Sequence, residues 1–224
     1  MIKLGLIKRK EDNENRHCAE MTINILLPKF KLYNFNDQRN GKLVKLIFKT
    51  ANIPYEDISI SRKEQWNAIK NETPLGTLPI LEMDGVKLGG QTAICRHLAW
   101  RFGLSGQSAT SDALLDMFAD LLLEAQILVF GPTDDNNDSN TNIIIVDDIN
   151  LEKICDRVAS IIEKQLIKNN TSYLIGEQVT WVDLMTYIFF SSLMDHGKNI
   201  NLDKHPSVKN MYKKISQLEL KNCA

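Results

Sequence analysis

The spacing of apolar and polar residues changes character about half-way along the chain. In the first half, short apolar runs between polar turns predict strands over residues 23–35, 53–60, 80–83 and 86–88. Apolar residues at helical spacing predict helices among these strands, over residues 42–52 and 91–102. Beyond residue 110 the patterns are helical, over residues 111–130, 150–169, 180–194 and 206–220. This order predicts a mixed α/β domain followed by an all-α domain.

Polar stretches set the predicted domain boundaries. Residues 1–22 are interpreted as a polar extension, because their charged middle offers little to bury. We expect the first domain over residues 23–104 and the helical domain over residues 111–224. Within the helical domain, residues 131–142 read GPTDDNNDSNTN, a tract without apolar anchors that predicts a flexible loop.

One helix start is predicted from side-chain chemistry. Thr180 supplies a hydroxyl and Asp183 a carboxylate three residues later, which is the spacing of a capping box. Replacing Asp183 should therefore cost about 1 kcal/mol or more of stability.

The segment over residues 73–85, TPLGTLPILEMDG, holds an unusual proline. Pro79 has no backbone N–H and would interrupt a central strand, yet it stands at the mouth of an apolar run. Two geometries fit. The Leu78–Pro79 bond could be cis, as only about 5–6% of X–Pro bonds are, or Pro79 could be an ordinary trans proline that begins an edge strand.

Composition and charge exclude several classes of function. With 43% apolar and 25% charged residues, the chain is typical of a soluble globular protein. A formal net charge of −1 implies no general attraction to nucleic acid or to an anionic membrane. The cysteines are scattered without a C-x-x-C pair and the histidines show no ligand spacing, so we expect free thiols in a reducing, cytoplasmic setting and no metal site.

A set of motifs, taken in chain order, resembles the cytosolic glutathione transferases, most closely the sigma class. The motifs are FKLYNFN at 30–36, YED at 55–57, WNAIK at 66–70, the segment 73–85, AICRHL at 93–98, FGLSG at 102–106, YLIG at 173–176 and VTWVD at 179–183. The resemblance implies an N-terminal thioredoxin-like domain, a C-terminal helical domain and a cis Leu78–Pro79 bond. It also implies conjugation of glutathione, as co-substrate, to small hydrophobic electrophiles in detoxification or small-molecule metabolism.

The thiol-activating position is where the chain departs from the family. The family has a tyrosine directly after the first strand, whose hydroxyl stabilises the glutathione thiolate. An ungapped comparison puts Asn34 at that place and Tyr33 one residue earlier. Because strand side chains alternate between faces, Tyr33 could act only through a backbone bulge. Asn34 could act through its amide, which can donate a hydrogen bond to a thiolate. Both residues stay open as the catalytic group.

The resemblance also implies a set of glutathione contacts. The residues that match contacts in the family are Trp66 and Lys70 for the glycyl carboxylate, Leu78 and Pro79 for the cysteinyl part, and Gln91 and Thr92, one residue late, for the γ-glutamyl carboxylate at a helix start. Thr77 stands where the family usually has glutamine or lysine. Asn40 stands where the family has arginine.

The helical domain contributes two further expectations from the resemblance. Asp120 matches an aspartate that reaches the partner subunit's ligand, which implies a homodimer. The electrophile pocket is expected to involve Phe35, Met117 and Leu121.

Two functions therefore stay open. The first is a catalytic glutathione transferase, which the ordered motif set favours. The second is a non-catalytic protein of the same fold, a binding or interaction module that has lost the thiol-activating tyrosine. The offsets at Asn34 and Gln91, together with Asn40 and Thr77, favour the second.

Overall fold

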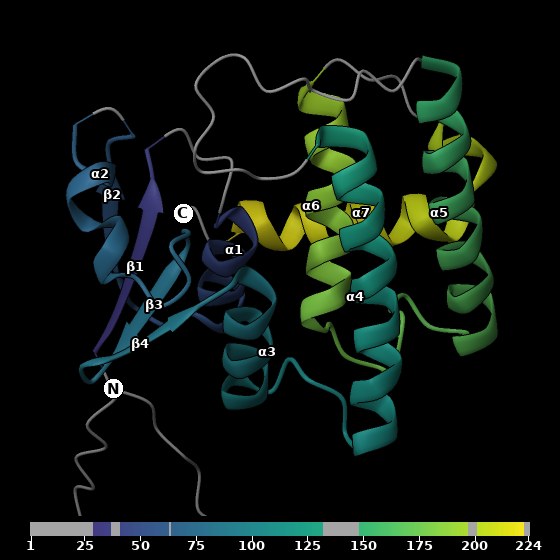
Figure 1. Cartoon of the computed structure of the whole chain (residues 1–224). Coiled ribbons are helices and arrows are strands. Elements are labelled where there is room, and N and C mark those ends of the chain that lie inside the picture. The colour runs from purple at the N-terminus through teal and green to yellow at the C-terminus, as the bar shows by residue number, and fades with distance from the viewer. Residues whose placement is uncertain (1–28, 37–40, 63, 132–147, 197–200, 222–224) are drawn as a thin grey trace, which may run out of the picture.

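A computed structural model describes residues 29–36, 41–62, 64–131, 148–196 and 201–221 (Figure 1). The first part contains β1 (Phe30–Phe35), α1 (Lys42–Ala51), β2 (Glu56–Ile60), α2 (Trp66–Ile69) with a 3-10 turn at Lys70–Glu72, β3 (Ile80–Met83), β4 (Val86–Gly89) and α3 (Gln91–Phe102). The second part contains α4 (Ala109–Phe130), α5 (Asp148–Asn169), α6 (Trp181–Asp195), a 3-10 turn at Leu202–Lys204 and α7 (Pro206–Lys221). The predicted change from mixed to helical structure is confirmed.

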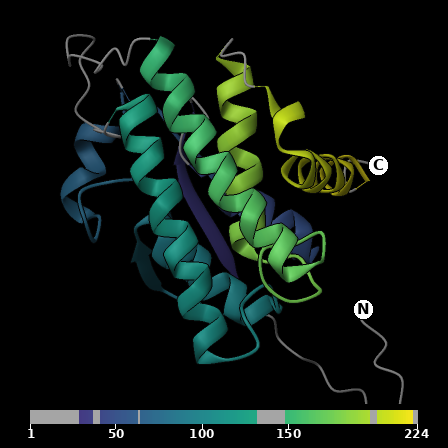
Figure 2. The same cartoon turned by 90° about the vertical axis from the view of Figure 1, so that its right-hand side faces the viewer.

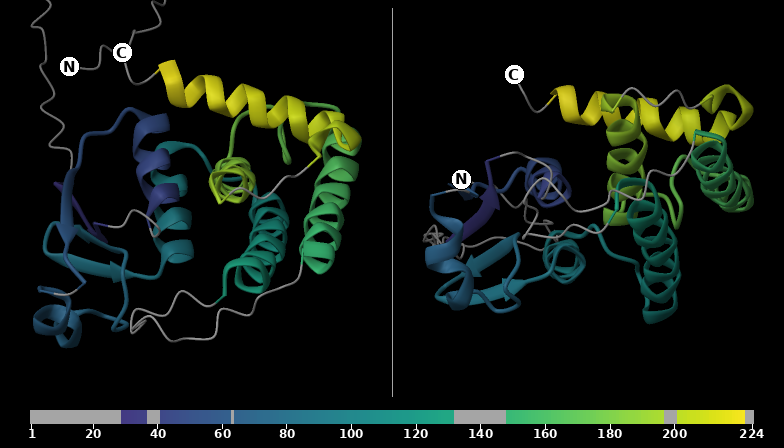
Figure 3. Two further views of the ribbon diagram at one scale, coloured as in Figure 1. Left: turned by 90° about the horizontal axis from the view of Figure 1, so that it is seen from above. Right: turned by 45° about the horizontal axis from the view of Figure 1, so that its top comes forward.

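The strands form one sheet in the order β2-β1-β3-β4. β1 runs parallel to β2 and antiparallel to β3, and β3 and β4 form the predicted hairpin about Asp84 and Gly85. Phe30 and Leu32 point into the core shared with α1 and α3, whereas Phe35 packs with Trp66 of α2 on the other face. Seen from above, α1 and α3 lie between the sheet and the helical part (Figure 3).

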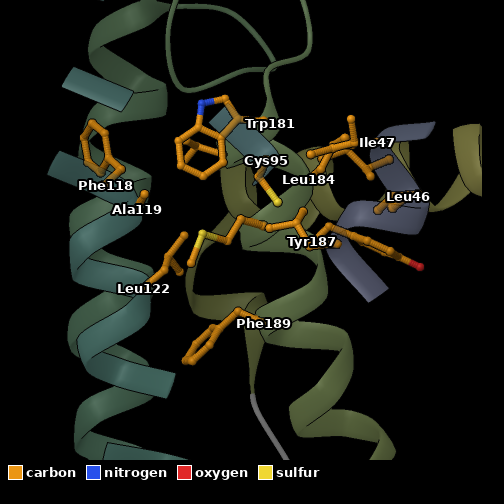
Figure 4. Packing of buried hydrophobic residues seen from close by; sticks show 14 of the residues in the cluster. Leu46, Ile47, Cys95, Phe118, Ala119, Leu122, Trp181, Leu184, Tyr187 and Phe189 are labelled. Carbon is orange, nitrogen blue, oxygen red and sulfur yellow. The ribbon is translucent and has the colours of Figure 1, made fainter. Parts of the chain in front are cut away.

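Helix α6 is the centre of the helical part and is buried along almost its whole length. Figure 4 shows its side chains between those of α4 on one side and those of α1 on the other; the labelled residues include Trp181, Leu184 and Tyr187 of α6, Phe118 and Leu122 of α4, and Leu46 and Ile47 of α1. The core is therefore continuous from the sheet to the helices. A view turned by 90° shows α4, α5 and α6 side by side, with α7 seen almost end-on (Figure 2).

Several predicted boundaries shift by a few residues. β2 begins at Glu56 instead of residue 53, because the chain first leaves α1 through Asn52 in a left-handed conformation and then passes Pro54. α4 begins at Ala109, since the Ser108 side chain caps it by accepting a hydrogen bond from the Ser111 N–H. The Leu78–Pro79 bond is cis. The predicted extension at residues 1–22 and all of the predicted loop except Gly131 lie outside the described residues.

A buried carboxylate on α5 caps the start of α7. Glu163 accepts hydrogen bonds from the backbone N–H groups of Ser207 at 3.1 Å and Val208 at 2.9 Å. Burial by itself would raise the pKa of Glu163, but these hydrogen bonds outweigh it and hold the pKa below its ordinary value. A lowered pKa means that this carboxylate contributes stability above its unfolded pKa, and that the contribution is lost as the pH falls through the folded pKa.

Glu163→Gln should therefore lower the free energy of unfolding by about 1 kcal/mol at neutral pH, through loss of the charged cap at the positive end of α7. The difference from wild type should shrink as the pH falls below about 4. Denaturant unfolding across this pH range measures it. Glu152→Gln, an exposed carboxylate on the same helix that lies 4.0 Å from Lys204, is the control and should change stability little. Equal effects of the two substitutions would contradict the capping role.

Candidate functional site

The candidate site surrounds the carboxyl end of β1. Phe35 at the end of β1, Trp66 of α2, and Leu78 with Ile80 around the cis turn pack into one small cluster on the α2 face of the sheet. Strand pairing brings Tyr33 of β1 opposite Ile80 of β3. Three of the residues predicted to contact glutathione, Trp66, Leu78 and Pro79, are thus brought together by the fold.

Asn34 is buried beside the start of α1. It is 1% exposed, and neither its Oδ1 nor its Nδ2 has a hydrogen-bond partner among the described residues. The amide lies against Gly41, where a side-chain carbon would come within 2.8 Å of Nδ2. An unpaired buried amide costs about 1–3 kcal/mol, so its presence in a native structure requires an explanation.

Tyr33 lies on the face of β1 opposite Asn34 and packs against the cluster of Phe35, Trp66, Leu78 and Ile80. The strand pairs with β2 in unbroken register from Lys31 to Phe35, so the bulge that would turn Tyr33 toward the face of Asn34 is not present within β1. The Tyr33 hydroxyl instead donates a hydrogen bond of 2.9 Å to Glu82 of β3. Burial and this hydrogen bond raise the pKa of Tyr33, which makes its hydroxyl a weaker acid than a free phenol.

Trp66 is packed and also carries an unpaired donor. Its ring is 2% exposed and meets the Phe35 ring edge-on at 5.1 Å between ring centres. Its Nε1 is buried without a hydrogen-bond partner in the described part of the chain. The guanidinium carbon of Arg62 lies 3.6 Å from the centre of the Phe35 ring on the same side of the sheet. The sequence did not predict Arg62 as a neighbour of this cluster, because a single cationic residue after a strand forms no distinctive pattern.

The turn from Lys70 to Thr77 leads into this cluster at Leu78 and lies against the glycines that precede α3. The Lys70 side chain runs along the turn, and its Cε passes 3.9 Å from the position that a side-chain carbon would take on Gly76. Leu75 lies over Gly89 and Gly90, which lead into α3. Thr77 is partly exposed on the same turn. The turn therefore packs against the Lys70 side chain at one end and against the glycines that precede α3 at the other.

Gln91 and Thr92 are the first residues of α3 and are partly exposed. The residue before them, Gly90, has a φ of 85° and provides no side-chain cap. The first N–H groups of a helix have no intrahelical acceptor, so this helix start can bind an anion such as a carboxylate.

The remaining predicted residues are spread more widely. Asp120 is exposed on α4, and Asn40 lies outside the described residues. Met117 is exposed on α4 and Leu121 is partly buried against the main core. Phe35 is 1% exposed in the α2-side cluster, so its predicted place in a pocket with Met117 is wrong. Side chains alternate along β1, which turns Phe35 to the face of the sheet opposite Leu32.

Comparison with known proteins agrees with this architecture. Residues 32–106 match the N-terminal domain of glutathione S-transferases, and residues 144–220 match the C-terminal domain. A probable glutathione S-transferase of Caenorhabditis elegans is 33% identical over 192 residues, which cover 81% of this chain and 88% of that protein. The chain belongs to the glutathione S-transferase family.

Solved structures of the family have the same fold as this transferase. A Nu-class enzyme from Haemonchus contortus superposes with a TM-score of 0.73 at 28% identity, covering 85% of this chain and 92% of that one. A glutathione S-transferase from Necator americanus, described as monomeric, superposes with a TM-score of 0.70 at 26% identity, covering 84% and 92%. Across its described residues, the transferase has no helix long and apolar enough to cross a membrane.

Proposed function

We propose that this glutathione transferase binds glutathione at the cis turn and adds its thiolate to small hydrophobic electrophiles. The observation that carries the proposal is the convergence of the turn at Leu78 and Pro79 with Trp66, whose buried indole N–H lacks a partner within the described residues. A donor of this kind, beside the cis turn, fits a peptide-like ligand with a carboxylate at its end.

The three parts of glutathione each have a matching group at this site. Trp66 and Lys70 hold the glycyl carboxylate. The backbone beside Pro79 pairs with the cysteinyl part, with Thr77 flanking it. The start of α3, with Gln91 and Thr92, receives the γ-glutamyl carboxylate through its N–H groups. Binding then holds the thiol near the electrophile, which supplies proximity, while lowering the thiol pKa from about 8.5 raises the fraction of thiolate, the reactive form.

Of the two candidates for activating the thiol, Asn34 is favoured over Tyr33. The Tyr33 hydroxyl is engaged by Glu82, whereas the Asn34 amide has N–H donors without an acceptor among the described residues. Tyr33→Phe should therefore leave kcat/KM close to the wild-type value and lower stability by about 0.5–1.5 kcal/mol, the worth of one hydrogen bond. A loss of activity of about a hundredfold, the scale for removing a catalytic donor, would instead assign thiol activation to Tyr33.

The alternative function, a non-catalytic binding module, is supported by the same engagement of Tyr33 by Glu82. Two measurements on the full chain separate the functions: retention on immobilised glutathione, and conjugation of glutathione to a generic aryl halide. Retention with turnover supports the transferase. Retention without turnover, for several electrophiles, supports the module. The absence of both retention and turnover would overturn the proposed function.

We further propose a cytoplasmic homodimer, with Asp120 of one subunit close to the ligand of the other. Support comes from exposed apolar side chains on the turn, β4, α3 and α4, namely Leu75, Val86, Trp100, Leu114 and Met117. The Necator americanus structure is described as monomeric, so light scattering at several concentrations is the deciding measurement. The motifs favour a class close to sigma and a role in detoxification.

A further inference from the structure

An ion pair joins the sheet part of the molecule to the helical part beside the thiol site. The Nζ of Lys42, the first residue of α1, lies 3.2 Å from the carboxylate of Asp195, the last residue of α6. Lys42 directly follows Gly41, against which the Asn34 amide is packed. A cation is therefore held one residue away from the contact of the amide that is favoured for thiol activation, and its charged end is directed toward the helical part.

Helix α6 has an open face on the same side. Apart from its last two residues, the helix is buried everywhere except at Ile188, Ser191 and Ser192, which are partly exposed. Residues three or four apart on a helix lie on one face, so these three share a face with Asp195. The open end of α6 therefore presents one apolar side chain and two hydroxyl groups beside the carboxylate that holds Lys42.

Two contacts mark the sides of this face. The pair of Lys42 with Asp195 lies on its α1 side. On its α4 side, the ring of His196 lies 5.3 Å from the ring of Phe130, the last residue of α4. Figure 4 shows the same order deeper in the core, with α6 between α4 and α1. The Lys42 ammonium thus borders a small, partly apolar surface that lies between these two helices and next to the thiol site.

Resting on the proposed function, we propose that Lys42 is a catalytic residue for electrophiles that carry a carbonyl group conjugated to a carbon–carbon double bond. Addition of the glutathione thiolate to the β-carbon forms the carbon–sulfur bond. The electron pair of the double bond moves toward the carbonyl oxygen, which becomes an enolate. The Lys42 ammonium donates hydrogen bonds to this oxygen as its negative charge develops. A proton from water then reaches the α-carbon and gives the saturated thioether.

The pair with Asp195 prepares the lysine for this role. An ammonium has three N–H donors, and Asp195 accepts a hydrogen bond from this one, which fixes the direction of a flexible side chain. The ammonium keeps donors for a ligand oxygen. The enolate oxygen lies at the far end of the conjugated system from the carbon that the sulfur attacks. A cation directed toward α6 therefore acts on the electrophile, while the thiolate is held at Asn34.

The test compares two aryl electrophiles with the full chain. Benzylideneacetone, a conjugated ketone, develops an enolate oxygen, whereas benzyl chloride loses chloride by direct displacement and develops none. Lys42→Met keeps the length of the side chain and removes its charge. It should lower kcat/KM for benzylideneacetone at least about tenfold, through loss of a donor to a developing oxyanion. It should leave kcat/KM for benzyl chloride close to the wild-type value, which also shows that the variant is folded and binds glutathione.

Two further variants are the controls. Lys42→Arg keeps a cation with several N–H donors and should retain most of the activity toward benzylideneacetone. Lys45→Met removes the next lysine of α1, which is paired with Asp57 of β2, and should leave both reactions unchanged. A loss for benzylideneacetone in Lys42→Met alone supports the catalytic role of Lys42.

The other outcomes separate the ways in which the proposal can fail. If the wild type turns over no electrophile, the proposed function fails and this inference with it. If Lys42→Met slows both reactions equally, the lysine acts on glutathione or on its thiolate, and this inference alone is overturned. It is also overturned if the wild type is active with benzyl chloride only. An unchanged rate with benzylideneacetone overturns it too, and reduces Lys42 to the ion-pair partner of Asp195.

Discussion

Asp183→Ala should lower the free energy of unfolding by about 3–5 kcal/mol. The Asp183 carboxylate is fully buried and accepts hydrogen bonds from the backbone N–H of Thr180 at 2.8 Å, from the Thr180 hydroxyl at 2.7 Å and from the backbone N–H of Leu174 at 2.8 Å. It thus completes the capping box of α6 and fixes the preceding loop to it. Alanine would leave two buried N–H groups without an acceptor, at about 1–3 kcal/mol each.

Denaturant unfolding followed by the helical circular-dichroism signal measures this loss. Asp195→Ala, at the exposed far end of the same helix, is the matched control. Its ion pair with Lys42 is solvent-exposed, so its loss should cost about 1 kcal/mol or less. If the two substitutions had similar effects, the capping network would not be what holds α6 in place.

The pH dependence gives a second readout of the same carboxylate. Burial raises the pKa of Asp183 to about 6, although the hydrogen bonds from Leu174 and Thr180 act in the opposite direction. Between an unfolded pKa of about 4 and this folded value, the folded state binds more protons than the unfolded state. Asp183 therefore lowers the stability of the wild type as the pH rises through that window. Asp183→Asn, which does not titrate, should lack this slope.

The same capping box shows what kind of structure can be predicted from sequence. The spacing of Thr180 and Asp183 encodes it within four residues, and the start of α6 follows. Helix α1 and the hairpin from Ile80 to Gly89 were predicted for the same reason, because periodicity and a turn of Asp84 and Gly85 are local signals. The cis bond before Pro79 followed from family resemblance, since the residues alone left it open.

The candidate site was harder to predict because its contacts are set by strand register. The partner of the Tyr33 hydroxyl depends on the pairing of β1 with β3, which puts Glu82 opposite Lys31 and within reach of Tyr33. The side of the sheet that Phe35 faces depends on the same register, and the sequence interpretation placed it wrongly. The unpaired amide of Asn34 depends on Gly41, seven residues away, having a left-handed backbone. No local pattern encodes any of these contacts.

Trp66 allows the structural and the ligand-binding roles of one buried residue to be separated. Trp66→Ala should lower the stability by about 3–5 kcal/mol, because the ring fills the cluster with Phe35, Leu78 and Ile80. That loss would follow from packing alone and says nothing about glutathione. The substitution that discriminates is Trp66→Phe, which keeps an aromatic ring in the cluster and removes the indole N–H.

Trp66→Phe should change stability by less than about 1.5 kcal/mol, because the cost of a smaller ring is offset by removing an unpaired buried donor. Glutathione binding should weaken about ten- to a hundredfold, since a hydrogen bond to a charged carboxylate contributes about 1.5–3 kcal/mol. Trp181→Phe, the same substitution in the core of the helical part, is the control and should leave glutathione binding unchanged. Calorimetric titration of both variants with glutathione decides the role: equal affinities would reduce Trp66 to a packing residue, and a selective loss at Trp66 would make its N–H a ligand contact.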